Sequence, residues 1–275
     1  MPKPRTQTAA GLSDARGYYS SITLTDQDKV CWSAYPYSVP AVKFVDGLML
    51  DPKVTIFVGE NGTGKSTLIE AIAVAAGFNP EGGSKNFNFT TRPSHSSLHN
   101  NIKLERGARR ERDGYFLRAE CMYNVATELD KLDANGGAGK PLIQSYGDVS
   151  LHEQSHGESF FALVSNRFGE DSFYVMDEPE SALSPDRQLY LLSQMHELIE
   201  NGNCQVVFAT HSPILMAYPG ARLYLIDRAG IHETTYKETE HYRIMHDFLT
   251  DHKSAIRSLF AAPTGSSVTR KRSAS

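Results

Sequence analysis

The chain has 275 residues, 40% of them hydrophobic, and a formal net charge of -4. This length and apolar content suit one large α/β domain with its own core and exclude a largely disordered chain. The small negative charge excludes a global attraction to nucleic acid, so such a contact would need a local basic patch. Three separated cysteines, no signal peptide and no apolar run near ~18 residues predict a cytoplasmic protein without direct membrane insertion.

The first part of the chain predicts a short lead-in followed by a β-layer. Residues 1–16 show no apolar period and are expected to be a disordered lead-in to a single domain over residues 17–260. Apolar and polar residues alternate in Ser21–Thr25 and again in Ala41–Val45, a pattern typical of half-buried strands. We therefore expect an antiparallel β-layer here. Residues 261–275 are expected to be a disordered tail.

The most specific motif follows at residues 54–67. Val54–Val58 is an apolar run typical of a buried parallel strand, and helical spacing resumes at Leu68. The loop between them fits the pattern G-x-x-x-x-G-K-[ST]. In such a loop the backbone N–H groups surround a polyphosphate, Lys65 reaches the β- and γ-phosphates, and Ser66 ligates Mg²⁺. The residues predicted to bind nucleotide here are Gly59, Glu60, Asn61, Gly62, Thr63, Gly64, Lys65, Ser66 and Thr67.

The middle of the chain predicts two strands, a helix and a loop. Ile102–Arg106 and Gly114–Glu120 have strand character and are expected to form a hairpin around an arginine-rich turn, which more often faces solvent than binds phosphate. Asn124–Leu132 has helical spacing. Asn135–Pro141 resembles a second phosphate loop, but no strand precedes it and Pro141 replaces the hydroxyl, so we expect a flexible loop.

A polar turn at Ser155–Glu158 opens the next predicted helix. Ser155 suits the N-cap position, Glu158 suits the capping-box partner, and Gly157 leaves the backbone approachable. The free N–H groups at such a helix start would also suit an anion. The residues alone leave a plain cap and an anion site open.

Two later strands end in residues that suit phosphate chemistry. Phe173–Met176 is apolar and leads into Asp177 and Glu178, at the sheet edge where parallel strands bind ligands. One carboxylate can hold Mg²⁺ through water, and the other can orient and deprotonate the attacking water. Gln205–Thr210 is a second buried strand that delivers His211 to the same edge, where its imidazole can touch a γ-phosphate.

The last predicted elements are a hairpin over residues 223–236 and a terminal helix. This helix runs through Tyr242 and Leu249 toward Phe260, with apolar residues at helical spacing. We expect it to close the fold.

The order of these motifs resembles the ABC-type ATPase heads, and among them the small bacterial AAA-family ATPases related to SMC and DNA-repair heads. The likeness spans residues 42–227. The resemblance implies an α/β fold of the P-loop NTPase class, with a mainly parallel sheet flanked by helices and an N-terminal antiparallel β-layer. It also implies Mg²⁺-dependent ATP hydrolysis by a protein that dimerises around ATP and drives or switches a partner macromolecule.

The same resemblance implies roles for individual residues. Ser155 and Gly157 match the signature loop, which caps the ATP of a second subunit. Asp177 and Glu178 match the Walker B pair, with Glu178 as the catalytic base. His211 matches the switch histidine and is the second expected catalytic residue.

Two positions depart from the family pattern. His156 stands where transporter-type signatures carry Gly, and Glu120 stands where the family's Q-loop carries Gln. With Glu120 included, the expected metal ligands are Ser66, Asp177 and Glu120.

Other P-loop functions are weighed against this one. A GTPase normally carries Asn-Lys-x-Asp, which this chain lacks, and a kinase would need an acceptor pocket and a lid. The ATP-binding subunit of a membrane transporter would co-purify with a membrane protein. The protein or nucleic-acid partner, and a role in DNA repair, phage defence or another process, stay open.

Overall fold

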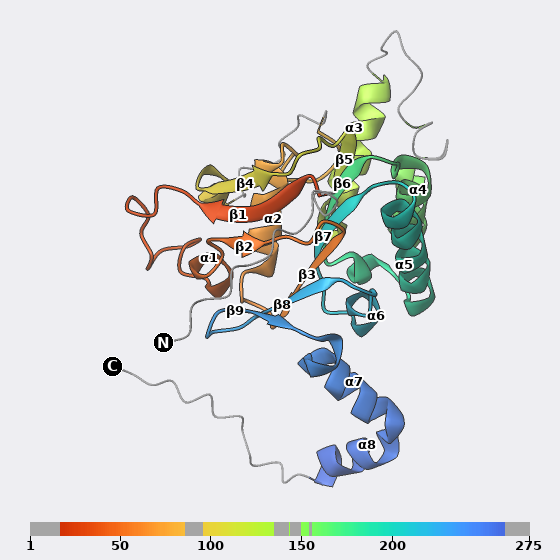
Figure 1. Ribbon diagram of the computed structural model, residues 1–275. Coiled ribbons are helices and arrows are strands. Elements are labelled where there is room, and N and C mark those ends of the chain that lie inside the picture. Colours follow the sequence, from red (N-terminus) through yellow and green to blue (C-terminus); the bar gives the residue numbers. More distant parts are fainter. Residues whose placement is uncertain (1–16, 86–95, 135–142, 144–149, 154–155, 262–275) are drawn as a thin grey trace.

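The computed structural model in Figure 1 describes residues 17–85, 96–134, 143, 150–153 and 156–261. The predicted lead-in and the flexible loop predicted at Asn135–Pro141 lie outside these residues. So do all residues of the predicted tail except Ala261.

The described strands form two sheets. The main sheet has the order β5-β6-β7-β3-β8-β9 and is parallel except for β9, which runs antiparallel to β8. The second sheet has the order β2-β1-β4 and is antiparallel throughout. The strands are β1 Tyr19–Leu24, β2 Leu48–Met49, β3 Val54–Gly59, β4 Ile102–Arg106, β5 Asp113–Arg118, β6 Ser172–Asp177, β7 Gln205–Ala209, β8 Arg222–Ile226 and β9 Ile231–Thr234.

Helices flank the main sheet. The α-helices are α1 Pro40–Lys43, α2 Lys65–Ala75, α3 Met122–Ala134, α4 His156–Arg167, α5 Pro185–Glu200, α6 Pro213–Met216, α7 Glu240–Thr250 and α8 His252–Ala261. Short 3-10 helices are η1 Ser97–Asn100, η2 Ala119–Cys121, η4 Leu151–Glu153, η5 Pro179–Ala182 and η6 Tyr236–Glu238.

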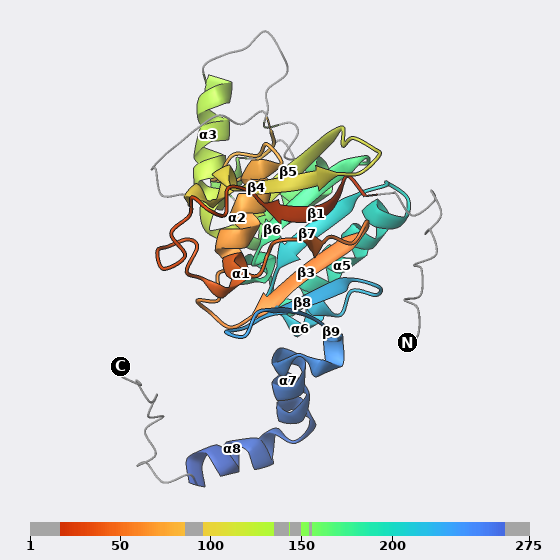
Figure 2. The same ribbon diagram turned by 60° about the vertical axis from the view of Figure 1, so that its left-hand side comes forward.

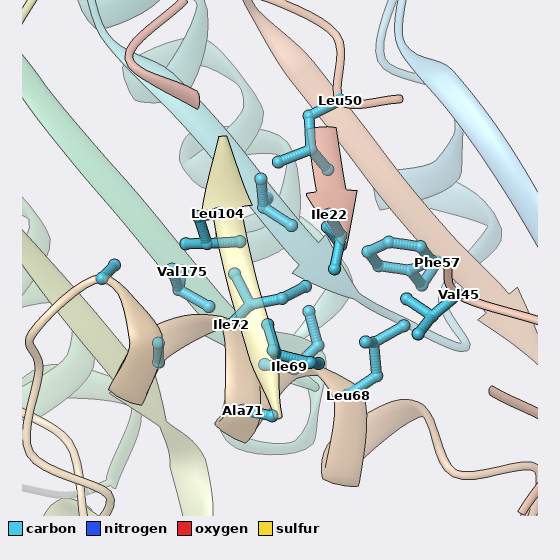
Figure 3. Close-up of a cluster of buried hydrophobic side chains, with 14 of the residues drawn as sticks. Ile22, Val45, Leu50, Phe57, Leu68, Ile69, Ala71, Ile72, Leu104 and Val175 are labelled. Carbon is cyan, nitrogen blue, oxygen red and sulfur yellow. The ribbon is translucent and has the colours of Figure 1, made fainter. Parts of the chain in front are cut away.

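Helix α2 lies between the two sheets. Its apolar side chains enter a core shared with the antiparallel sheet and with one face of the main sheet, as Figure 3 shows for Leu68, Ile69 and Ile72 beside Ile22 of β1 and Leu104 of β4. The opposite face of the main sheet is covered by α3, α4, α5 and α6. Because both faces are covered, β3, β6 and β7 are buried along their whole length, which explains their largely apolar sequences. The predicted fold class is therefore confirmed.

The predicted strand at Ala41–Val45 is wrong. Pro40 instead opens the short helix α1, where Ala41 and Val42 are buried together and Val45 is buried one turn later. A proline at the first helical position is compatible with a helix because its missing N–H would have no partner there. Five residues of alternation are too few to separate a half-buried strand from one helical turn.

The predicted hairpin over residues 102–120 is also wrong, although both of its strands exist. β4 pairs with β1 in the antiparallel sheet, and β5 pairs in parallel with β6 at the edge of the main sheet. The arginine-rich turn links the two layers, and Arg106 and Arg112 pair with Glu111 and Asp171. The second strand ends at Arg118, so Glu120 lies in η2.

The predicted C-terminal helix does not close the fold. It is divided into α7 and α8, which project from the body beyond the β8–β9 hairpin in Figures 1 and 2. Residues 240–261 are all described, and none of them is buried. Large apolar side chains are exposed on this arm: Ile244, Met245, Phe248, Leu249, Ile256, Leu259 and Phe260. In the described part of the chain, no helix is both long and apolar enough to cross a membrane.

Candidate functional site

The site is built where three neighbouring parallel strands end. Asp177, the last residue of β6, is in register with Ala209 at the end of β7, and Ala209 is in register with Phe57 of β3. The carboxyl ends of parallel strands share one edge of a sheet, and ligands bind there. The motifs after β3, β6 and β7 are thereby brought together.

The loop after β3 has the backbone of a phosphate-binding cradle. Gly59, Gly62 and Gly64 have φ values of 153°, 81° and 93°, which residues other than glycine rarely adopt. At Gly59 a Cβ atom would collide with the carbonyl oxygen of Ile226 in β8. The loop therefore requires glycine both for its conformation and for its close packing on the sheet.

Lys65 is held inside this loop. Its side chain donates to the carbonyl oxygens of Gly59 at 2.8 Å and Glu60 at 3.0 Å, and the residue is only 4% exposed. Burial lowers the pKa of the Lys65 ammonium, while the negative charges of Glu178, Asp177 and Glu180 oppose that shift. The loop lysine and the carboxylates after β6 therefore lie within electrostatic range of one another.

Ser66 and Thr67 follow in the first turn of α2, and both are half-buried. The hydroxyl of Thr67 lies 3.4 Å from the Tyr35 hydroxyl, on a ring that is largely exposed at the edge of the loop. Ser66 is therefore placed in the same turn that carries Lys65.

An open cleft of about 660 Å³ lies against the loop. Its walls come from the loop itself, from the β8–β9 turn and from the start of α7. The residues that line it are Pro40, Gly59, Glu60, Asn61, Gly62, Thr63, Leu225, Ile226, Asp227, Arg228, Ala229, Glu238, Glu240, His241 and Arg243. Its size suits a ligand of nucleotide dimensions.

Asp177 is 6% exposed and lies beside an arginine that is partly buried. Nε of Arg118, at the end of β5, is 3.7 Å from Oδ2 of Asp177, and Nη1 of Arg118 donates to Oε2 of Glu70 at 2.8 Å. The cation of Arg118 therefore joins α2 to the end of β6.

Glu178 and His211 face one another. Oε1 of Glu178 is 3.4 Å from Nε2 of His211, and the Glu178 N–H donates to the carbonyl oxygen of Ala209 at 3.1 Å. Glu178 has a left-handed backbone with φ 46°, which is uncommon for a residue with a side chain and marks a site where the surroundings hold the strain. The Glu178 side chain is 39% exposed, so it is open to a water molecule.

The Glu180 side chain contacts the backbone of His211. Its Oε1 accepts a hydrogen bond from the His211 backbone N–H, while its Oε2 is buried without a hydrogen-bond partner among the described residues. Burial raises the pKa of the Glu180 carboxyl, and the His211 N–H opposes this shift.

His241, from the first turn of α7, reaches the same place. Its Nε2 is 3.1 Å from Nδ1 of His211, with a tilt of 52° between the two rings. Burial is the main cause that lowers the pKa of both imidazoles, and the Lys65 ammonium lowers it further.

The structure thus brings together most of the predicted residues. Lys65, Asp177, Glu178 and His211 share one edge of the sheet. Three residues there were not predicted as site residues: Arg118, Glu180 and His241. The position of Arg118, a charged residue at the end of an apolar strand, was an available signal. No local pattern relates His241 to His211, because the two residues belong to separate elements.

Other predicted residues remain apart from this group or outside the described residues. Ser155 is outside them, directly before α4, and no side-chain position is described for Glu120 in η2. Gly157 lies in the first turn of α4, where a Cβ atom would meet the Arg187 guanidinium and lie 3.3 Å from the Ala182 carbonyl oxygen. Its neighbours therefore belong to η5 and α5, not to the loop that holds Lys65.

Two family models match consecutive parts of the chain. One, described as "AAA domain", matches residues 42–146, and the other, described as "AAA domain, putative AbiEii toxin, Type IV TA system", matches residues 142–217. The phosphate-binding loop lies in the first match, and Glu178 and His211 lie in the second. A comparison with curated proteins returned no match.

Two similar solved structures come from ABC transporters. One is titled "An inward-facing conformation of a putative metal-chelate type ABC transporter"; it is 16% identical, covers 82% of this chain and 88% of its own, and has a TM-score of 0.47. The other is cbiO1 from Clostridium perfringens, described as part of the ABC transporter complex cbiONQ. It is 14% identical, covers 88% of this chain and 99% of its own, and has a TM-score of 0.46.

Proposed function

From the two AAA-domain matches we propose that the chain is a P-loop ATPase of the AAA/ABC type, that two copies close around ATP, and that turnover switches a partner macromolecule. The observation that carries the chemistry is the convergence of Lys65, Glu178 and His211 at one sheet edge. Its nucleotide is ATP, held with Mg²⁺.

The loop and Lys65 bind the phosphates. The positive-φ glycines allow the loop to turn its backbone N–H groups toward a phosphate, and the start of α2 adds the positive end of its dipole. The Lys65 ammonium already lies within hydrogen-bond distance of two loop carbonyls, so little side-chain entropy is lost when it contacts the β- and γ-phosphates. Residues Gly59 to Thr67 therefore form the nucleotide-binding segment.

A magnesium ion fits the residues present. A serine hydroxyl in the first turn of α2 and an aspartate side chain at the end of β6 are the hard oxygen donors that Mg²⁺ prefers, so Ser66 and Asp177 would hold it. When bound, Mg²⁺ would supply positive charge to the phosphate oxygens. Glu120 stays a weaker proposal for a third ligand, because it departs from the family's pattern.

Glu178 is proposed as the general base. Its partly exposed carboxylate can accept a proton from water, and its backbone is fixed by the hydrogen bond to Ala209. His211 faces Glu178 and is proposed to contact the γ-phosphate through Nε2. A neutral imidazole is favoured here because burial and Lys65 lower the pKa of His211.

The dimer is proposed because Gly157, the signature residue that the structure describes, does not line the nucleotide cleft of its own chain. Gly157 packs against Ala182 and Arg187, on the segment that follows Glu178. A second subunit related by a two-fold axis would bring the start of its α4 to the γ-phosphate, where Ser155 and free N–H groups suit an anion. ATP would then join the two subunits.

Sedimentation tests the dimer. The Glu178→Gln protein should sediment as a dimer with Mg-ATP and as a smaller species with ADP. Adding Ser155→Arg should block that dimer and spare ATP binding, whereas the matched control Ser193→Arg, on the exposed side of α5, should leave it intact. A dimer that persists with arginine at 155 would contradict the signature role.

The switched partner is proposed only by class. The description of the second matching family names a toxin of a type IV TA system, which supports a defence role, and the resemblance to DNA-repair heads supports a nucleic-acid task. Capture of partners from the native host with the Glu178→Gln protein, with and without ATP, would separate a protein from a nucleic acid.

A further inference from the structure

We propose that His241 is a positioning residue, which fixes the tautomer and orientation of His211 and so ties the start of the α7–α8 arm to the hydrolysis site. This proposal rests on the role of His211 proposed above. His241 lies outside both matched family segments.

The atoms in contact define the hydrogen-bond direction. Nε2 of His211 faces the carboxylate oxygen of Glu178 at 3.4 Å, and Nδ1 of His211 lies 3.1 Å from Nε2 of His241. The contact is not aligned as a hydrogen bond, but a carboxylate repels a nitrogen lone pair, so the favourable tautomer of His211 carries its proton on Nε2. Its Nδ1 is then an acceptor, and Nε2 of His241 must be the donor. The same Nε2–H of His211 is the group that would meet a γ-phosphate.

The root of the arm holds His241 in place. The buried Thr239 caps α7 by accepting a hydrogen bond from the Tyr242 N–H at 3.3 Å, and its own hydroxyl donates to the Tyr236 carbonyl at 2.7 Å. At η6, directly before α7, Thr235 and Glu238 form a capping box. α7 also contacts α6, which begins two residues after His211. The arm is therefore anchored where it meets the site, although it is exposed farther out.

Charges around the pair favour the neutral forms that this hydrogen bond needs. Lys65 and His211 face His241 from the body of the protein, Glu60 faces it from the loop, and Glu240 lies beside it on α7. Burial and the Lys65 charge lower the pKa of His241, against a smaller opposing effect of Glu240 and Glu60. A doubly protonated pair would place two N–H donors against each other, so the contact requires at least one neutral ring.

A matched pair of variants tests the hydrogen bond. His241→Gln keeps an N–H donor on an unbranched chain. Methionine in His241→Met has nearly the same shape as that glutamine but has no donor. We expect His241→Met to lower kcat about tenfold with little change in KM, as is usual for residues that orient a functional group, and His241→Gln to restore most of kcat. Thermal unfolding of both proteins checks that the fold is intact.

A double-mutant cycle shows whether His241 acts through His211. In a His211→Ala background, His241→Met should cause no further loss of kcat, because the residue that it orients is gone. Independent, multiplicative losses would overturn the proposal, as would wild-type kcat in His241→Met. Equal losses in the Gln and Met variants would show that a ring, and not a donor, is required, and would also overturn it.

Nitrogen-15 spectra of the histidine rings give a readout without turnover. In the wild-type protein, His211 should show a protonated Nε2 and an unprotonated Nδ1, and His241→Met should convert this to a mixture of tautomers. A mixture already present in the wild-type protein would contradict the proposal. If these spectra agree but the wild-type protein fails to hydrolyse ATP, the proposed function fails while the histidine contact stands.

Discussion

Nε2 of His211 lies 3.4 Å from Oε1 of Glu178, although the two residues follow different strands. The contact exists because β6 and β7 are parallel neighbours in register from Phe173 to Asp177, so the turns after them leave the sheet at one edge. The proposed base and the proposed phosphate-contacting group are thereby held together by backbone pairing. Four predictions follow from this arrangement and from the loop beside it.

Lys65→Ala should weaken ATP binding on the order of 10- to 100-fold, because it removes a charge-assisted contact to the phosphates. Titration calorimetry with a non-hydrolysable ATP analogue would measure the loss. Lys53→Ala is a suitable control, since Lys53 makes only an exposed pair with Glu200. Equal affinities for the wild-type and Lys65→Ala proteins would rule out the assigned role of Lys65.

Glu178→Gln should lower kcat by about 10²–10⁴-fold while leaving ATP affinity nearly unchanged. The amide keeps the size of the side chain and cannot take the proton from water. Phosphate release and nucleotide binding should be measured on the same preparation, with the exposed Glu170→Gln as control. Turnover at the wild-type rate would show that another group is the base.

Acid should destabilise the protein through His211. Burial, with Lys65, lowers the pKa of this imidazole below its ordinary value of 6.5, so below that pH the unfolded chain binds a proton that the folded chain does not. The free energy of unfolding should therefore fall as the pH drops from about 7.5 to 5.5, and it should fall less in His211→Gln.

Denaturant titration at several pH values would measure this difference. The Glu178 carboxylate raises the pKa of His211, so its removal in Glu178→Gln should make the acid sensitivity extend to lower pH. A steeper loss in His211→Gln than in the wild-type protein would contradict the sign worked out here.

Gly59→Ala should destabilise the protein more than Gly62→Ala does. Both positions have positive φ, and the left-handed region costs a side chain about 1–2 kcal/mol. At Gly62 the space for a Cβ atom is open, whereas at Gly59 the Ile226 carbonyl oxygen occupies it, so β8 must also move. Thermal unfolding of the two variants would show the difference, and equal stabilities would mean that the close approach at Gly59 is easily relieved.

Several parts of the molecule were predictable from local patterns. β3, β6 and β7 were recognisable because a strand covered on both faces needs a continuous apolar run, and the loop before α2 because its glycines and lysine are fixed in spacing by the phosphate they surround. Asp177, Glu178 and His211 followed, since each ends such a strand or lies within two residues of its end.

The errors have a shared cause. β4 and β5 are adjacent in sequence and look like a hairpin, but the register of β4 with β1 and of β5 with β6 depends on residues distant in sequence. The apolar spacing of residues 240–261 correctly indicated helix. It did not indicate that the apolar face of α7 and α8 would remain exposed, because exposure depends on what packs against the helices.

The sequence by itself determined the nucleotide loop, the carboxylate pair, His211 and the positions of β3, β6 and β7 along the chain, because these depend on backbone conformation and burial within a few residues. Only the tertiary structure decided that Arg118 lies beside Asp177, that Glu180 accepts a hydrogen bond from the His211 N–H, and that His241 lies within hydrogen-bond distance of His211. Those contacts join residues from separate elements, and their geometry is set by how the layers pack.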